Sequence, residues 1–386
     1  MDLMADERSL GLVALGLALT PALSGALVAL LCGAVLPGLV PPLGRAVVGP
    51  LVHPLRRAVG HGLPTPLVVA VALSVVAALI LAVERRVRRA LARQPGRVAY
   101  VRPMAQVVAV ATGKGGVGKS SIAAAVAGVL AAKKKHIAVV ELDPQGDLAD
   151  DLGCRDDAAH DGGEAVTAAI RTGAPLGPGI QARERLTYYP GGPALEALNR
   201  TPGWSGLDSK LGESIAKLKG YDLVLIDTPP SAEALQHVSL AAAQHLLIPT
   251  AVDTSSLRAL YAIATRLVEV EAVNPDLAFL GVVLWNVPTA ASRIRADARQ
   301  TLNEILGDTV PLLDTTVRSA FATAYECRRR GMLPHELARL QGGNEPFWKA
   351  LAEGRSPDRV PTSALSLAGD YTRLAKEITD LLEAAR

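Results

Sequence analysis

The sequence predicts a three-layer α/β/α fold with a mostly parallel sheet, preceded by two apolar helices of transmembrane length. An apolar strand at 106–111 leads through a glycine-rich loop into an alanine-rich helix at 120–132. A second apolar strand is expected at 137–142. Two long uncharged runs lie before this region. Strands separated by helices indicate a parallel sheet covered on both faces.

The loop after the first strand has the spacing of a phosphate-binding loop. Residues 113–120, GKGGVGKS, fit the pattern G-x-x-x-x-G-K-[ST]. Glycines let the backbone approach an anion closely, and a helix N-terminus attracts phosphate. Lys119 is expected to reach the β- and γ-phosphates, and the Ser120 hydroxyl to ligate Mg²⁺. The expected nucleotide contacts are Gly113, Lys114, Gly115, Gly116, Val117, Gly118, Lys119, Ser120 and Ser121. The segment predicts a P-loop NTPase fold.

A second lysine, Lys114, is not required by a general phosphate loop. The string KGGVGKS, with a lysine at each end, resembles the deviant Walker-A ATPases of the ParA/MinD family. Further segments resemble that family in the same order: ELDPQGD at 141–147, LTYYPGG at 186–192, GYDLVLIDTPPS at 220–231, LLIP at 246–249 and GVVLWN at 281–286. The resemblance covers most of residues 98–386, which we expect to form the ATPase domain.

The resemblance implies ATP and Mg²⁺ as cofactors and assigns residue roles. Asp143 matches the aspartate that orients the attacking water. Asp227 ends an apolar strand, where a Walker-B aspartate holds the Mg²⁺ shell. Lys114 would reach the phosphates bound by a second copy. We therefore expect Lys114, Lys119 and Asp143 to be catalytic, and Ser120, Asp143 and Asp227 to serve the metal.

Three further positions follow from the same resemblance. Asn286 lies in the strand that brings base-contacting residues to the nucleotide in this family. Glu141 stands where the family usually has an aspartate, so its role is left open. Pro229, beside the Walker-B strand, is a possible site residue.

The function implied is an ATP-dependent dimerisation switch with slow, partner-stimulated hydrolysis. Such a protein would form a homodimer with ATP, respond to a ParB-like or membrane-complex activator, and position plasmid or chromosomal DNA or a membrane-linked complex. Two alternatives stay open: a membrane-linked bacterial tyrosine kinase-like protein and a nucleotide-binding scaffold without significant turnover. The short loop between the uncharged runs, and Tyr371 as the sole tyrosine after Tyr325, disfavour the kinase.

Residues 1–97 form the predicted membrane segment. Ser9–Gly44 contains no charged residue, and we expect one span near 10–36 and a second at 63–83. Arginines concentrate in the following flank, 84–97, which predicts a cytoplasmic side. The expected location is the inner membrane, with membrane lipid as a partner and the ATPase domain in the cytoplasm. Two alternatives are a buried helical pair and a native start at Met104, which would give a cytoplasmic protein.

Charge and cysteine usage limit other functions. Residues 1–97 contain 10 Lys and Arg against 4 Asp and Glu, whereas the remaining residues contain 30 against 33. Nucleic-acid binding would therefore need a local patch, and the candidates are Arg293, Arg295 and Arg299 on a predicted helix at 291–306, and Arg328, Arg329 and Arg330. The three cysteines lack the spacing of a disulfide framework or zinc site. A C-terminal amphipathic helix at 365–385 is expected to pack against the sheet.

Overall fold

The computed structural model describes residues 105–199, 207–230, 233–251, 254–289, 292–306, 310–341, 352–353 and 360–385. The chain divides into two units, Met1–Arg93 and Gln94–Arg386, and all described residues belong to the second. The predicted spans at 10–36 and 63–83 and the flank at 84–97 therefore lie outside the described residues. Within the described ranges, no helix is both long and apolar enough to cross a membrane.

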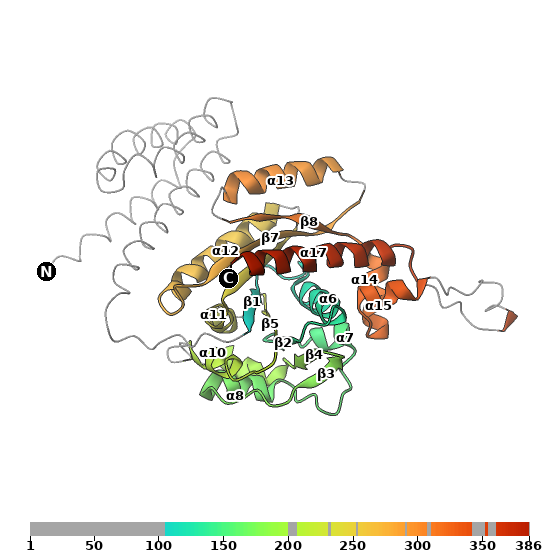
Figure 1. Ribbon diagram of the computed structural model, residues 1–386. Coiled ribbons are helices and arrows are strands. Elements are labelled where there is room, and N and C mark those ends of the chain that lie inside the picture. The colour runs from blue at the N-terminus through green and yellow to red at the C-terminus, as the bar shows by residue number, and fades with distance from the viewer. Residues whose placement is uncertain are drawn as a thin grey trace, which may run out of the picture. The chain divides into compact units, whose positions relative to one another are not determined.

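One sheet of eight strands runs through the described part of the chain (Figure 1). Its strand order is β3-β4-β2-β5-β1-β6-β7-β8. The strands are β1 (Gln106–Val110), β2 (Ile137–Glu141), β3 (Ile180–Arg183), β4 (Leu186–Tyr189), β5 (Leu223–Asp227), β6 (His245–Thr250), β7 (Ala278–Val287) and β8 (Leu312–Arg318). Neighbouring strands are parallel except β3 and β4, which are antiparallel. The predicted mostly parallel sheet is confirmed.

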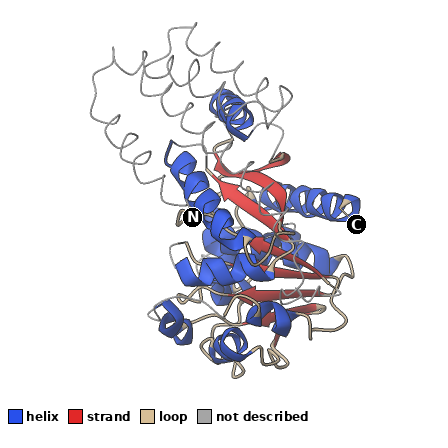
Figure 2. Cartoon of the chain, turned by 90° about the vertical axis from the view of Figure 1, so that its left-hand side faces the viewer, coloured by secondary structure: helices blue, strands red, loops and turns tan. Residues whose placement is uncertain are grey.

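Helices cover both faces of this sheet (Figure 2). The longer helices are α6 (Lys119–Ala132), α8 (Glu164–Thr172), α11 (Glu233–Ala242), α12 (Thr254–Glu271), α13 (Ser292–Leu306), α14 (Phe321–Arg330) and α17 (Ala364–Ala384). The shorter ones are α7 (Leu148–Leu152), α9 (Glu196–Asn199), α10 (Lys210–Ile215), α15 (Pro334–Arg339) and the 3₁₀ turn η2 (Pro193–Leu195). The sequence prediction of three α/β/α layers holds for this unit.

The alternation of side chains in β1 explains the two covered faces. Val108 and Val110 are buried in an apolar cluster that includes α6 and α17, whereas Val107 and Ala109 are buried in a second cluster that includes α8 and α11. Successive strand residues point to opposite faces, so a strand covered on both sides must be apolar throughout. This is why the central strands read as continuous apolar runs.

The predicted elements agree with the structure to within about three residues at each end, the usual uncertainty of helix and strand boundaries. The C-terminal helix α17 contacts α6, α15 and β8, so its apolar side packs within the domain as predicted. The stretch at 150–185 contains the end of α7, the helix α8 and the edge strand β3. The end of α7 and the strand β3 are too short for hydrophobic periodicity to reveal them.

Candidate nucleotide-binding site

The phosphate loop joins β1 to α6, at the edge of the sheet where the parallel strands end. Gly116 and Gly118 have φ angles of 72° and 79°, in the left-handed region that glycine favours. Gly118 is the N-cap of α6, and its carbonyl accepts a hydrogen bond from the Ile122 amide at 2.8 Å. The helix N-terminus therefore points its first amides toward the loop, as a phosphate-binding site requires.

Lys119 begins α6 and is buried, with 6% of its surface exposed. Burial lowers the pKa of its ammonium group, while the carboxylates of Asp227 and Asp143 raise it. A lysine held close to two acidic groups in a concave, water-poor site can pair with phosphate charge. The structure thus brings together Lys119, Asp143 and Asp227 from three separate segments, and their roles in catalysis and metal binding stay predictions.

Asp227 ends β5 and is fully buried. Neither of its carboxylate oxygens has a hydrogen-bond partner among the described residues. Burial raises the pKa of Asp227 to about 7, although the nearby Ser120 hydroxyl and Lys119 ammonium act in the opposite direction. A buried carboxylate without a donor is costly unless something compensates it. Oxygen groups from Asp227, Ser120 and Asp143 suit the ligand chemistry of Mg²⁺, so these residues fit that ion.

Asp143 follows β2 in the segment that leads to α7. Its carboxylate accepts a hydrogen bond from the Gln145 amide at 2.9 Å, and it lines the cavity beside the phosphate loop. Burial raises the pKa of Asp143, whereas the Gln145 amide and Lys119 lower it. The carboxylate is accessible from the cavity and held by its own segment, which suits a group that contacts a ligand.

The structure gives Glu141, whose role the sequence leaves open, a role in holding the neighbouring backbone. Its buried carboxylate accepts hydrogen bonds from the Leu148 amide at 2.9 Å, the Gly191 amide at 3.2 Å and the Tyr188 hydroxyl. Burial, with a smaller effect of Asp227, raises the pKa of Glu141 to about 8. Because Glu141 and Leu148 flank the segment containing Asp143, this carboxylate closes that segment into a loop and ties it to the turn after β4.

A cavity of about 1260 Å³ opens beside the phosphate loop. It is bordered by Gly116, Gly118, Lys119, Ser120 and Ser121 of the loop, by Asp143 and Asp147, by Pro229 and Pro230, by Trp285, and by Phe321, Tyr325, Arg328 and Arg329 of α14. Pro229 therefore lies at the cavity, and its carbonyl accepts a hydrogen bond from Gln236 at 2.8 Å. Val117 is buried within the loop, and Gly113 and Lys114 are half-buried.

The end of β7 contributes a different residue from the one predicted. Asn286 is exposed, has a φ angle of 59°, and is not among the residues that border the cavity. Its assignment as a base contact stays a prediction. Trp285, its neighbour, borders the cavity instead, and its indole Nε1 donates to the Tyr371 hydroxyl at 3.3 Å. Sequence reasoning missed Trp285, although strand alternation means that only one of two adjacent residues can point toward the loop.

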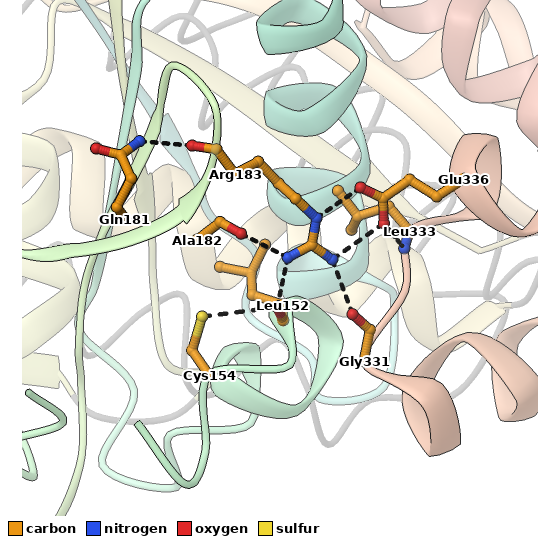
Figure 3. Close-up of polar contacts among 8 residues, drawn as sticks. All are labelled: Leu152, Cys154, Gln181, Ala182, Arg183, Gly331, Leu333 and Glu336. Atoms are coloured by element: carbon orange, nitrogen blue, oxygen red, sulfur yellow. Dashed lines mark hydrogen bonds and ion pairs between the residues drawn. The ribbon is translucent and has the colours of Figure 1, made fainter. Parts of the chain in front are cut away.

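The segment after Asp143 is attached to the C-terminal helices. Arg328 of α14 donates to Asp151 of α7 at 2.9 Å, and the Ser121 hydroxyl donates to the same carboxylate at 3.5 Å. Figure 3 shows a second attachment, in which the Arg183 guanidinium contacts Glu336 and the carbonyls of Leu152 and Gly331. The first attachment joins α7 to α6 and α14 at the border of the cavity, and the second joins the end of α7 to β3 and α15.

The arginines predicted to contact DNA fall into two separate groups. Arg328 pairs with Asp151, while Arg329 and Arg330 pair with Glu326. On α13, Arg293 and Arg295 are exposed, and Arg299 donates to the Leu313 carbonyl at 2.8 Å. The triplet on α14 is thus largely engaged with acidic neighbours, and its contact with DNA stays a prediction, as does that of the α13 arginines.

A buried strand, a glycine loop and a helix N-terminus that holds a buried lysine define a P-loop nucleotide-binding protein. Residues 108–323 match the CobQ/CobB/MinD/ParA nucleotide binding domain, and the chain belongs to this family. It is 33% identical over 178 residues to the chromosome-partitioning ATPase Soj of Thermus thermophilus, covering 46% of this chain and 68% of Soj.

Two further comparisons extend over more of the chain. It is 28% identical over 274 residues to the maintenance of carboxysome distribution protein A of Gloeobacter kilaueensis, covering 71% of this chain and 94% of that protein. A variant of Cyanothece McdA in complex with ATP superimposes with a TM-score of 0.56 at 17% identity, covering 72% of this chain and 98% of that one. This last similarity shows a shared fold. The predicted ParA/MinD membership is confirmed.

Proposed function

We propose that this protein binds ATP with Mg²⁺, hydrolyses it slowly, and uses the nucleotide to switch between monomer and dimer. The observation that carries this proposal is the arrangement of Asp227, Lys119 and Ser120. A buried carboxylate, whose oxygens have no hydrogen-bond partner among the described residues, lies near a buried ammonium and a hydroxyl at the N-terminus of α6. A nucleotide with its bound cation would supply the charges that this arrangement lacks.

Each residue then has a chemical role. Lys119 pairs with the β- and γ-phosphates, and the backbone amides of the loop surround them. Ser120 and Asp227, with Asp143, would hold Mg²⁺, which supplies neutralisation of phosphate charge. Asp143 would also orient the attacking water. Asn286 would approach the base from the end of β7. Glu141 would hold the segment that contains Asp143 in place, through the hydrogen bonds it accepts from the Leu148 and Gly191 amides.

Lys114 would act between two copies. It lies in the loop before Gly115 and Gly116, which are both exposed, so this part of the loop faces outward. A lysine delivered by a second copy would stabilise charge on the transferring phosphoryl group. Two relatives, a chromosome-partitioning ATPase and a maintenance of carboxysome distribution protein, support an ATP-dependent positioning role for the protein.

The same relatives support a role in positioning a cargo. We infer that the protein positions or partitions a cargo, either plasmid or chromosomal DNA or a membrane-linked complex, with the help of an activating partner of ParB-like type or from that complex. Arg293, Arg295 and Arg299 are the candidates for contacts to DNA phosphates. Residues 1–97 would anchor the protein in the inner membrane, so that positioning takes place in the membrane plane.

Dimerisation provides the test of this function. We expect ATP, under conditions that block hydrolysis, to convert the full-length protein from monomer to dimer in analytical ultracentrifugation. Lys114→Ala should bind ATP with similar affinity but remain monomeric. Lys135→Ala, which removes an exposed lysine outside the loop, is the matched control and should dimerise normally. A wild-type protein that binds ATP and stays monomeric at high concentration would exclude the dimer mechanism while leaving nucleotide binding intact.

A further inference from the structure

One face of α14 is turned toward the cavity beside the phosphate loop. The residues of this face follow one another at helical spacing, and all border the cavity: Phe321, Ala324, Tyr325, Arg328 and Arg329. Glu326 accepts hydrogen bonds from Arg329 at 2.8 Å and from Arg330 at 2.9 Å, so one carboxylate of the same helix holds both of these arginines. Arg328 differs from them, because its partner lies on another helix, α7.

A single carboxylate separates Arg328 from the helix that follows the phosphate loop. Arg328 Nε donates to Asp151 Oδ1 at 2.9 Å, and Asp151 Oδ2 accepts a hydrogen bond from the Ser121 hydroxyl at 3.5 Å. Ser121 directly follows Ser120, the expected Mg²⁺ ligand. Helices α14 and α7, which carry the ion pair, are in contact with each other (Figure 1). The guanidinium is therefore held at the end of the cavity where the phosphates of a nucleotide would lie.

The ion pair occupies only one side of the guanidinium. Arginine has N–H donors on Nε and on both terminal nitrogens. Among the described residues, only Nε of Arg328 has a hydrogen-bond partner. Because 47% of the side chain is exposed and Arg328 borders the cavity, a ligand in the cavity can reach the terminal nitrogens. Asp151 thus orients the group without using up its donors.

The acidic residues around the phosphate loop make a further cation useful for binding a polyphosphate. Asp143, Asp147 and Asp151 border the cavity together with Lys119. Like charges a few ångströms apart repel one another, and phosphate groups placed beside these carboxylates would be repelled. Partial burial lowers the pKa of the Arg328 guanidinium, but Asp151, Asp147 and Asp150 raise it overall, so the group keeps its charge. Arg328 therefore places a permanent positive charge between the carboxylates of α7 and the cavity.

We propose that Arg328 contacts the phosphate chain of the nucleotide bound by its own copy, as a second cation beside Lys119. Nε would stay on Asp151, which fixes the plane of the guanidinium, and a terminal nitrogen would donate to a phosphate oxygen. The inference rests on the proposed nucleotide binding. It does not rest on dimerisation, because Lys114 is the residue expected to act from a second copy. It also gives Arg328 a ligand other than the DNA predicted from the sequence.

Calorimetric titration of the full-length protein with ATP and Mg²⁺ tests this contact. Arg328→Gln should weaken ATP binding about tenfold or more, because a charge-assisted hydrogen bond is lost. Arg328→Lys keeps the charge but not the planar fork, and should recover part of the affinity. Arg339→Gln is the matched control, because it removes an exposed arginine of α15 that does not border the cavity, and it should bind ATP like the wild type.

The Asp151→Asn background separates a ligand contact from a structural role of the ion pair. Asp151→Asn alone should not weaken ATP binding, because it removes a negative charge near the phosphates. Adding Arg328→Gln should still lower the affinity about tenfold in this background. No unpaired carboxylate is left behind in the double variant, so loss of the ion pair cannot account for that effect. If Arg328→Gln has no further effect there, Arg328 only joins α14 to α7 and the inference is wrong.

The same measurements distinguish this inference from the proposed switch. A tenfold loss of affinity in Arg328→Gln, with a wild type that binds ATP but stays monomeric in ultracentrifugation, would support the contact and exclude the dimer mechanism. Equal ATP affinity in the wild type and Arg328→Gln would exclude the contact and leave the switch intact. A wild type that binds no ATP would exclude both.

Discussion

The indole of Trp285 occupies the space that a side chain at Gly118 would need. A Cβ atom built on Gly118 would lie 2.2 Å from Cε2 of the indole, and the φ angle of 79° is unfavourable for other residues. The phosphate loop is therefore supported by β7, and through the Tyr371 hydroxyl by α17.

This contact predicts a role for Trp285 in nucleotide affinity. Trp285→Ala should weaken ATP binding about tenfold and lower the free energy of unfolding by about 2–3 kcal/mol, because a half-buried aromatic contact is lost beside the loop. Trp285→Phe, which keeps a flat ring, should have a much smaller effect on both. The measurements are calorimetric ATP titration and urea unfolding of the full-length protein.

A double-mutant cycle tests whether the indole of Trp285 directly restricts the side chain at position 118. Gly118→Ala should abolish ATP binding in the wild-type background, because both the clash and the left-handed backbone oppose it. In the Trp285→Ala background the clash is absent, so the added cost should fall to the backbone term of about 1–2 kcal/mol. If the effects of the two changes are simply additive, the indole does not restrict this position.

Asp143 and Lys119 should differ in which kinetic step they affect. Asp143→Ala should keep ATP affinity within about threefold but lower turnover roughly a hundredfold or more, since its carboxylate would act on the attacking water. Lys119→Ala should instead weaken nucleotide binding itself. Asp156→Ala, an exposed aspartate in the loop after α7, is the matched control. ATP hydrolysis by Asp143→Ala at the wild-type rate would show that another group orients the water.

Glu141 should make the stability of the nucleotide-free protein depend on pH. Its pKa is raised from 4.5 to about 8 in the folded protein, mainly by burial. The folded state therefore holds this proton more tightly than the unfolded state, and stability is largest below about pH 4.5 and falls as pH rises toward 8.

Glu141→Gln should remove most of that dependence. Between pH 5.5 and 7.5 the free energy of unfolding of the wild type should fall by a few kcal/mol, and that of Glu141→Gln by distinctly less, with Asp227 accounting for part of the remainder. Urea titrations at the two pH values measure both slopes. Equal slopes in the two proteins would mean that Glu141 is already ionised near neutral pH.

The sequence was informative wherever a pattern had a local physical cause. The phosphate-binding loop could be identified from residues 113–120 alone, because glycines, a lysine and a helix start must be adjacent to bind phosphate. Asp227 could be placed at the end of an apolar strand, whereas Asp143 was placed by its match to a segment of the ParA/MinD family. Trp285 and the Arg183–Glu336 pair could not, because they depend on which residue of a strand faces inward and on packing between segments distant in sequence.

The membrane anchor is the prediction that lies outside the described residues. Two uncharged runs at 10–36 and 63–83 are each long enough to span a hydrocarbon core, and the arginines at 84–97 would be costly to translocate. We therefore expect the full-length protein to stay in the inner-membrane fraction after an alkaline carbonate wash, with or without nucleotide. Arg85 and later residues should be protected from protease added outside intact spheroplasts.

Mass measurement of the native N-terminus is the necessary control, because a chain that begins at Met104 would lack both uncharged runs. Release into the carbonate wash of a protein that retains residues 1–103 would favour a buried helical pair instead.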